Sequence, residues 1–313
     1  METSRKVVIV GAGQVGAAFA YALMIKGLAT SIVIIDQDVK RAEGHVMDLN
    51  HGLAFVQPTR ITVGDYSDCK DAAIVAVTAG GAQKPGETRL DLVRKNTEML
   101  KDMIPQIVEH EPRILLMVSN PVDVLTYAAL KLSGYPTSRV IGSGTTLDTA
   151  RFRYMLSEQC RIDPRNVHAY VVGEHGDSEV AVWSGVNIGS VRFDQYCLTC
   201  PTRCSMEERN ALFDRVKNAA YEIIARKGAT NFAIGLAMVR ISETILRDEN
   251  SVLTVSTLVN DYHGISNVCL SVPAIVNQNG VSRVLTLDLD ESEIEQLQHS
   301  ASVLKGVIKD LGL

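Results

Sequence analysis

A histidine flanked by glycines follows an apolar segment in the second half of the chain. The stretch VVGEHGDSEV (171–180) overlaps the run VHAYVV (167–172), which predicts a buried strand ending at Gly173. Histidine exchanges a proton near neutral pH, because its unperturbed pKa is about 6.5. His175 is therefore a candidate for proton transfer in a closed pocket. The alternative is a turn that contains a structural histidine.

An aspartate and an arginine, Asp148 and Arg151, stand three residues apart in a segment with helical spacing. Both side chains should lie on one face of that helix. A guanidinium fork can hold a carboxylate through two parallel hydrogen bonds, a geometry that lysine cannot reproduce. The pair therefore indicates either a carboxylate-binding arginine or a surface ion pair, which would contribute about 0–1 kcal/mol.

Two more polar residues follow predicted loops or strands. Arg89 lies in GAQKPGETRLDL, a stretch rich in glycine and proline that leads into a long helical pattern. A loop that closes over a substrate could bring this cation to a carbonyl oxygen, where it would stabilise developing negative charge. Asn120 follows the strand-like run RILLMVS and precedes Pro121. Its amide can hydrogen bond to a substrate oxygen or to a cofactor.

A glycine motif near the N-terminus predicts a dinucleotide site. In VVIVGAGQVGAAFA, Gly11, Gly13 and Gly16 have the G-x-G-x-x-G spacing between a strand-like run and a helical pattern. The first glycine permits a tight turn, the second a close approach to a pyrophosphate, and the third close packing of helix on sheet. Val15, inside the motif, is expected to contact the cofactor.

An acid twenty residues beyond the motif indicates which dinucleotide binds. Asp36 ends the run SIVIID, and a carboxylate there can accept both hydroxyls of an adenosine ribose while repelling a 2′-phosphate. NAD is thus favoured over NADP. FAD is disfavoured because the remaining polar groups suit a small acid, and the alternative for Asp36 is a simple helix cap.

The elements that must position these residues predict an α/β fold. Five apolar runs in the first half alternate with helical patterns, which indicates a parallel, doubly wound sheet of the Rossmann type. The runs are KVVIV, SIVIID, AAIVAVTAG, RILLMVSN and RVIGSG. The second half predicts long helices and the strands VLTVSTLVN, VCLSVPAIVN and RVLTLDLD, hence an α+β lobe with an antiparallel sheet. We expect an NAD-binding domain at 1–144 and a substrate domain at 145–313.

Composition restricts the class of partner. The chain has 313 residues, a formal net charge of -5 and no basic run, so nothing favours nucleic acid. No apolar stretch predicts a secretion signal or a membrane span, and the expected location is the cytoplasm.

Six cysteines leave a metal site to be weighed. Cys197, Cys200 and Cys204 lie close together in YCLTCPTRCS, but no fourth ligand is near. A surface loop of reduced thiols is favoured over a metal centre, and no metal is expected. The role of this stretch stays open.

Six motifs together resemble the bacterial-type NAD-dependent L-lactate dehydrogenases of the lactate/malate dehydrogenase superfamily. They are GAGQVG, GAQKPGETRLDL, SNPVDV, GTTLDTARFR, GEHGDS and KGAT, which occur in the family's order over nearly the whole chain. The resemblance implies a homotetramer of glycolysis and fermentation that interconverts pyruvate and L-lactate. Malate dehydrogenases share most of these motifs and are the alternative.

The resemblance also implies roles for particular residues. Asp148 matches the carboxylate partner of the catalytic histidine, where it would fix the tautomer of His175 and raise its pKa. Thr230 and Ile234 match positions that line the substrate and nicotinamide pockets, although Ile234 also fits a plain helix core.

Substrate choice depends on Gln83, because malate dehydrogenases have arginine at the matching position. A neutral glutamine would leave the second carboxylate of oxaloacetate unpaired and buried, at a cost of several kcal/mol. Pyruvate's methyl group needs no such partner, so the resemblance favours pyruvate.

A second site is implied by Arg153 and His168, which resemble residues that bind fructose 1,6-bisphosphate between subunits of activated bacterial members. Two copies would form a cationic hole for phosphates. The alternative is that Arg153 and His168 are solvent-exposed side chains that bind no effector.

A non-catalytic NAD-binding protein is a further alternative, since fold does not fix function. Such a protein would tolerate loss of His175, Asp148, Arg89 or Arg151. The presence of all four favours an enzyme.

Overall fold

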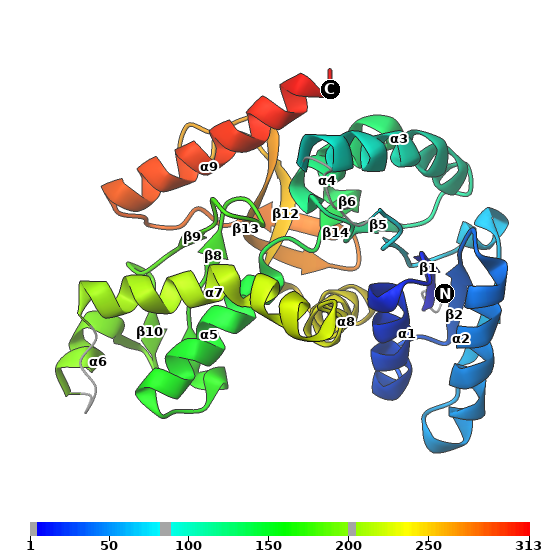
Figure 1. The fold of residues 1–313 in the computed structure, drawn as a ribbon, viewed down its shortest axis with the longest axis horizontal. Helices are drawn as coiled ribbons and strands as arrows, with labels where there is room; N and C mark the ends of the chain where they lie inside the picture. The colour runs from blue at the N-terminus through cyan, green and yellow to red at the C-terminus, as the bar shows by residue number, and fades with distance from the viewer. Residues whose placement is uncertain (1–4, 82–88, 200–204) are drawn as a thin grey trace.

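A nine-stranded mixed sheet forms the centre of the molecule (Figure 1), in the order β14-β13-β12-β6-β5-β4-β1-β2-β3. The computed structural model describes residues 5–81, 89–199 and 205–313. Six strands are parallel: β1 (Lys6–Val10), β2 (Ser31–Ile35), β3 (Arg60–Val63), β4 (Ile74–Val77), β5 (Ile114–Met117) and β6 (Val140–Gly142). The antiparallel strands are β12 (Ser251–Val259), β13 (Val268–Asn277) and β14 (Gly280–Val284).

Helices pack on both faces of the parallel part. In the first half these helices are α1 (Gln14–Lys26), α2 (Val39–His51), α3 (Arg89–Val108) and α4 (Val122–Ser133). The second half contains α5 (Thr146–Cys160), α6 (Phe193–Thr199), α7 (Met206–Lys227), α8 (Phe232–Leu246) and α9 (Glu291–Asp310). The doubly wound α/β fold predicted from alternating strand and helix patterns is confirmed.

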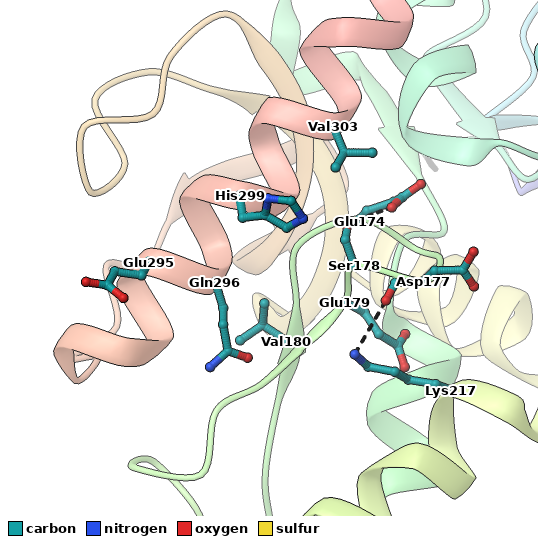
Figure 2. A pocket seen from close by; sticks show the side chains of 10 residues that line it. All are labelled: Glu174, Asp177, Ser178, Glu179, Val180, Lys217, Glu295, Gln296, His299 and Val303. Atoms are coloured by element: carbon teal, nitrogen blue, oxygen red, sulfur yellow. Dashed lines mark hydrogen bonds between the residues drawn. The ribbon is translucent and has the colours of Figure 1, made fainter.

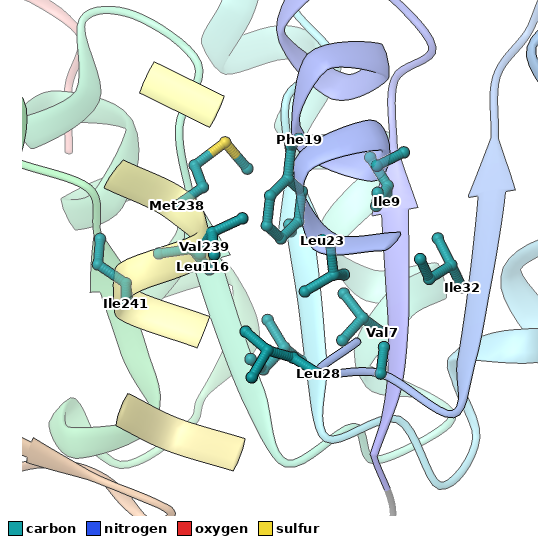
Figure 3. Close-up of a cluster of buried hydrophobic side chains, with 14 of the residues drawn as sticks. Val7, Ile9, Phe19, Leu23, Leu28, Ile32, Leu116, Met238, Val239 and Ile241 are labelled. Carbon is teal, nitrogen blue, oxygen red and sulfur yellow. The ribbon is translucent and has the colours of Figure 1, made fainter. Parts of the chain in front are cut away.

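Alternate residues of each parallel strand enter different cores, which explains why the strands are apolar throughout. Val7 and Ile9 of β1 belong to the core that contains side chains of α1, α2 and α8. Val8 and Val10 belong to the core formed with α3 and α4. Figure 3 shows the first core, in which Phe19 of α1 points toward α8. Helix α8 therefore packs the C-terminal half of the chain against the N-terminal half.

The antiparallel strands continue the parallel sheet, because β12 pairs with β6 through Ser256 and Gly142. A side chain at Gly142 would collide with Ser256 and with Thr126 of α4, so glycine permits this junction. The predicted boundary at 144/145 lies between β6 and α5; that division into two domains stays a prediction.

Two local predictions were wrong. VHAYVV forms two short strands, β7 (Val167–His168) and β8 (Val171–Val172), which pair with β10 (Asn187–Ile188) and β9 (Val180–Ala181) in different sheets. A third strand, β11 (Val191–Arg192), pairs with β10. Hydrophobicity alone does not reveal where a strand changes partner. The predicted strand RVLTLDLD (283–290) is also mostly not β-strand, because β14 ends at Val284.

Cysteine burial differs from the expected surface loop at one position. Cys69, Cys160 and Cys269 are buried, as expected for small core residues. Cys197 is buried too, in α6, because Phe193 and Cys197 share the helix face that packs against α7. Cys200 and Cys204 lie outside the described residues. In the described ranges, none of the helices combines the length and hydrophobicity that a bilayer span requires.

Candidate active site

The loop that carries His175 is fixed by long-range contacts of its backbone. Gly173 has a φ of 95° and pairs with Ser271 of β13. The backbone N–H of Glu174 then donates a hydrogen bond to the hydroxyl oxygen of Ser300, 2.8 Å away. The N–H of His175 donates to Oδ2 of Asp123, 2.7 Å away. The histidine is therefore held by β13, by α9 and by the first turn of α4.

One hydrogen-bonded chain links three predicted side chains. His175 Nδ1 lies 2.6 Å from Asp148 Oδ2, and Arg151 Nη1 donates to the other oxygen of Asp148 at 2.7 Å. Asp148 is almost fully buried, whereas 25% of the His175 side chain is exposed. The ring can thus reach a ligand with Nε2 while Nδ1 stays with the aspartate. The ion pair of Arg151 with Asp148, which was the alternative to carboxylate binding, is present, although Asp148 is buried and the pair does not lie on the surface.

The surrounding charges favour a protonated histidine. Burial lowers the pKa of His175, but the negative charge of Asp148 and the hydrogen bond to it outweigh burial and raise the pKa to about 9. Burial acts to raise the pKa of Asp148, and the charges of His175 and Arg151 outweigh this effect and lower it. An imidazolium–carboxylate pair at neutral pH results, which is the form required to protonate a ketone.

A cavity of about 320 Å³ opens onto this chain. Its walls include Asn120, Asp148, Arg151 and His175, together with side chains of α3 and α7. The structure therefore brings four of the predicted substrate-site residues around one space large enough for a small acid. Gln83 lies outside the described residues. Arg89 is the first residue of α3, and its side chain is also outside the described part.

The glycine motif forms a second cavity, of about 210 Å³, lined by Gly11, Gly13 and Asp36 among others. Gly11 has a φ of 112°, and a Cβ there would collide with Ala79. A Cβ at Gly16 would collide with the carbonyl oxygen of Gly11. Among the described residues, and apart from its chain neighbours, no atom lies within 4 Å of a Cβ built on Gly13. Open space beside Gly13, at the start of α1, fits a pyrophosphate that approaches the backbone.

Asp36 connects the end of β2 to the glycine loop. Its Oδ2 accepts a hydrogen bond from the N–H of Ala12 at 2.6 Å, and Oδ1 accepts one from Asp38 at 2.8 Å. These bonds hold a carboxylate at the cavity wall, where it suits ribose hydroxyls and opposes a 2′-phosphate. The residues present therefore fit NAD.

Comparison with known proteins identifies the family. Residues 5–142 match the model of the lactate/malate dehydrogenase NAD binding domain, and residues 145–312 match that of the alpha/beta C-terminal domain of the same family. The chain belongs to the lactate/malate dehydrogenase family. Its N-terminal half is accordingly an NAD-binding domain.

Individual members of the lactate/malate dehydrogenase family match over the full chain. The L-lactate dehydrogenase of Acetivibrio thermocellus is 54% identical, over 99% of this chain and 98% of that protein. L-lactate dehydrogenase 1 of Clostridium acetobutylicum is 52% identical, over 97% and 98%. The crystal structure of MGS-M5, a lactate dehydrogenase enzyme from a Medee basin deep-sea metagenome library, superposes with a TM-score of 0.97 at 46% identity, covering 99% of this chain and 100% of that one.

Three cofactor or substrate candidates lie away from the hydrogen-bonded side chains of His175, Asp148 and Arg151. Val15 and Ile234 are half-buried and pack against the core shared by α1 and α8. Ile234 packs against the core, and this packing is compatible with its predicted place in the wall of the nicotinamide pocket. Thr230 precedes α8, is half-buried, and does not line the cavity at His175. Its contact with substrate stays a prediction.

The predicted effector residues lie on two elements that are in contact, Arg153 on α5 and His168 on β7. The Nε of Arg153 donates to the carbonyl oxygen of Ala169 at 3.0 Å, and its guanidinium lies over the Tyr170 ring at 5.3 Å. His168, next to Ala169, is exposed on β7. A cavity of about 500 Å³ is lined by Arg153 and Arg240 but not by His168.

Sequence reasoning missed two buried carboxylates beside His175. Asp123 on α4 holds the backbone of the histidine, and burial raises the pKa of Asp123 to about 6, against the hydrogen bond from His175. Glu179 lies on the same loop as His175 and is 4% exposed. Asp123 belongs to SNPVDV and Glu179 follows GEHGDS, so an acid inside or beside a motif was the available signal.

Proposed function

We propose that this protein is an NAD-dependent L-lactate dehydrogenase that interconverts pyruvate and L-lactate. The observation that carries the chemistry is the continuous chain His175–Asp148–Arg151 along one cavity. Relatives named L-lactate dehydrogenase, at 54% and 52% identity over nearly the whole chain, favour lactate over malate.

The protein's own groups would act as follows. Arg151 holds the substrate carboxylate through its guanidinium, while Asn120 and Thr230 contact the substrate. His175, protonated and oriented by Asp148, gives its proton from Nε2 to the keto oxygen. Arg89 stabilises the negative charge that develops on that oxygen. NADH, held by the glycine loop and Asp36, would supply the hydride that the carbonyl carbon accepts. In the reverse direction, neutral His175 takes the alcohol proton.

The cofactor is held by residues of the first half. Gly11, Gly13 and the start of α1 suit the pyrophosphate, and Asp36 suits the adenosine ribose. Val15, Asn120 and Ile234 complete the proposed contacts. No metal takes part in the proposed reaction.

Assays of NADH oxidation with pyruvate and with oxaloacetate test this function. We expect a higher kcat/KM for pyruvate. A preference for oxaloacetate would replace the proposal by malate dehydrogenase. If neither substrate is turned over, the protein would instead be a non-catalytic NAD-binding protein or a dehydrogenase of another 2-hydroxy acid.

Assembly and location belong to the same proposal. Large apolar side chains are exposed one helical turn apart on two helices that pack together, Tyr21 and Ile25 on α1 and Phe232 and Leu236 on α8. Such a surface suits contact with a second copy of the chain, and the homotetramer is proposed from the resemblance to bacterial-type L-lactate dehydrogenases. Buried thiols outside any disulfide, as at Cys69 and Cys269, suit the reducing cytoplasm.

Fructose 1,6-bisphosphate is the proposed activator, bound by Arg153 and His168 from two subunits. We expect the sugar phosphate to lower the half-saturating pyruvate concentration about fivefold or more, the usual lower range of allosteric coupling. Arg153→Gln should abolish this change, because a neutral amide cannot pair with a phosphate. Pyruvate saturation curves with and without the effector measure both effects. Superimposable curves in the unsubstituted enzyme would eliminate activation.

A further inference from the structure

Glu179 is a buried carboxylate between two cavities. It lines the cavity at His175 and also a larger one, of about 610 Å³, on the other side of the histidine loop. Figure 2 shows this second cavity between α9 and the 174–180 loop, with Glu179 beside Lys217 of α7. Oε1 of Glu179 is buried and has no hydrogen-bond partner among the described residues. An unsatisfied buried carboxylate oxygen is costly, so its retention calls for a reason.

The same carboxylate is close to the proton-transfer pair. One nitrogen or oxygen atom from each of Asp148, His175 and Glu179 lies within 4.8 Å of the others. At that distance, buried charges influence one another strongly, because little water separates them. Asp123, which is also buried, accepts a hydrogen bond from the backbone N–H of His175 and does not line the cavity at His175.

Glu179 and His175 each favour the charged form of the other. Burial and the negative charge of Asp148 raise the pKa of Glu179 to about 8, while the charges of His175, Lys217 and Arg151 oppose this rise. Glu179 in turn contributes to the raised pKa of His175, after Asp148 and Asp123. The two groups thus titrate in neighbouring pH ranges.

We propose that Glu179 is a positioning residue for proton transfer, whose ionised carboxylate keeps His175 protonated to a higher pH than the His175–Asp148 pair alone would. The inference rests on the proposed function. The sign follows from charge. Neutral Glu179 adds nothing to the field at the ring, whereas ionised Glu179 stabilises the imidazolium. A neutral residue at position 179 should therefore let His175 lose its proton at lower pH.

Other ionisable groups face this region from every packed element. They are Glu174 and Asp177 on the loop, Asp123 on α4, Asp148 and Arg151 on α5, Lys217 and Tyr221 on α7, and Glu295 and His299 on α9. Glu174 accepts a hydrogen bond from the Ser178 hydroxyl at 2.6 Å. Asp177 is exposed, and salt and water screen its charge. Glu179 is the buried acid that faces both cavities.

The test is the pH dependence of kcat/KM for pyruvate, with NADH and the intact enzyme, in Glu179→Gln. Glutamine keeps the shape and removes the charge, so we expect the midpoint of the alkaline decline to fall by about one pH unit, the scale at which sites count as coupled. Glu179→Asp keeps a carboxyl group, so the midpoint of its alkaline decline should return most of the way to that of the unsubstituted enzyme.

Glu174→Gln is the matched control, since Glu174 is equally buried at 4% on the same loop; its midpoint should stay that of the unsubstituted enzyme. If Glu179→Gln does not fold, Glu179→Ala provides the same comparison. An unshifted midpoint in the neutral variant, or an equal shift in Glu174→Gln, would overturn the inference while leaving pyruvate reduction intact. If the unsubstituted enzyme does not reduce pyruvate, the proposed function fails first.

Discussion

Replacing His175 by asparagine should lower kcat/KM for pyruvate reduction by about 10²- to 10⁴-fold, the range that a positioned acid–base group contributes. Asparagine can hydrogen bond to Asp148 but cannot deliver a proton to the keto oxygen. NADH affinity, measured by fluorescence titration, should change little, because the glycine loop and Asp36 line a separate cavity.

A matched control uses a histidine remote from both cavities. His51 is exposed at the end of α2, and His51→Asn should retain the activity of the unsubstituted enzyme. If His175→Asn kept activity within about tenfold of the original, well below the usual contribution of such a group, another residue would have to be the proton donor.

Gln83→Arg should move the preference from pyruvate toward oxaloacetate by about 10²-fold or more in the ratio of kcat/KM values. An arginine would pair with the second carboxylate of oxaloacetate, and it would place an uncompensated cation beside the methyl group of pyruvate. Leaving a buried charge unpaired costs several kcal/mol, and each 1.36 kcal/mol corresponds to a factor of ten in rate.

The two substrates must be assayed with the same preparation, so that the fraction of active enzyme cancels in the ratio. Gln83→Asn serves as the control, because it alters the side-chain length without adding charge and should leave pyruvate preferred. An unchanged ratio in Gln83→Arg would mean that position 83 does not select the substrate.

Much of the fold was predictable because the signals were local. Runs such as KVVIV are apolar on both faces, and the two cores on either side of β1 are the direct consequence. The glycine motif also specified part of its own geometry, since a Cβ at Gly16 would collide with the carbonyl oxygen of Gly11 inside the same motif. Helix α9 begins with a capping box between Asp290 and Glu293, which is also a local signal.

The surroundings of the histidine were less predictable because they depend on distant contacts. Asp123 precedes His175 by 52 residues, and their hydrogen bond exists only after α4 and β8 have packed in the same fold. Glu179 has no distinguishing spacing, and only its burial shows that its charge matters. Continuation of the sheet from β6 into β12 likewise joins Gly142 to Ser256, which no local pattern predicts.

The most direct test of the proposed proton transfer compares the pH dependence of the two reaction directions in the unsubstituted enzyme. Pyruvate reduction needs protonated His175, so its kcat/KM should be constant at low pH and fall as pH rises through about 9. Lactate oxidation needs the neutral ring, so its kcat/KM should rise through the same midpoint. Mirror-image profiles with a shared midpoint are the predicted result, and profiles that change in the same direction would contradict a single proton carried by His175.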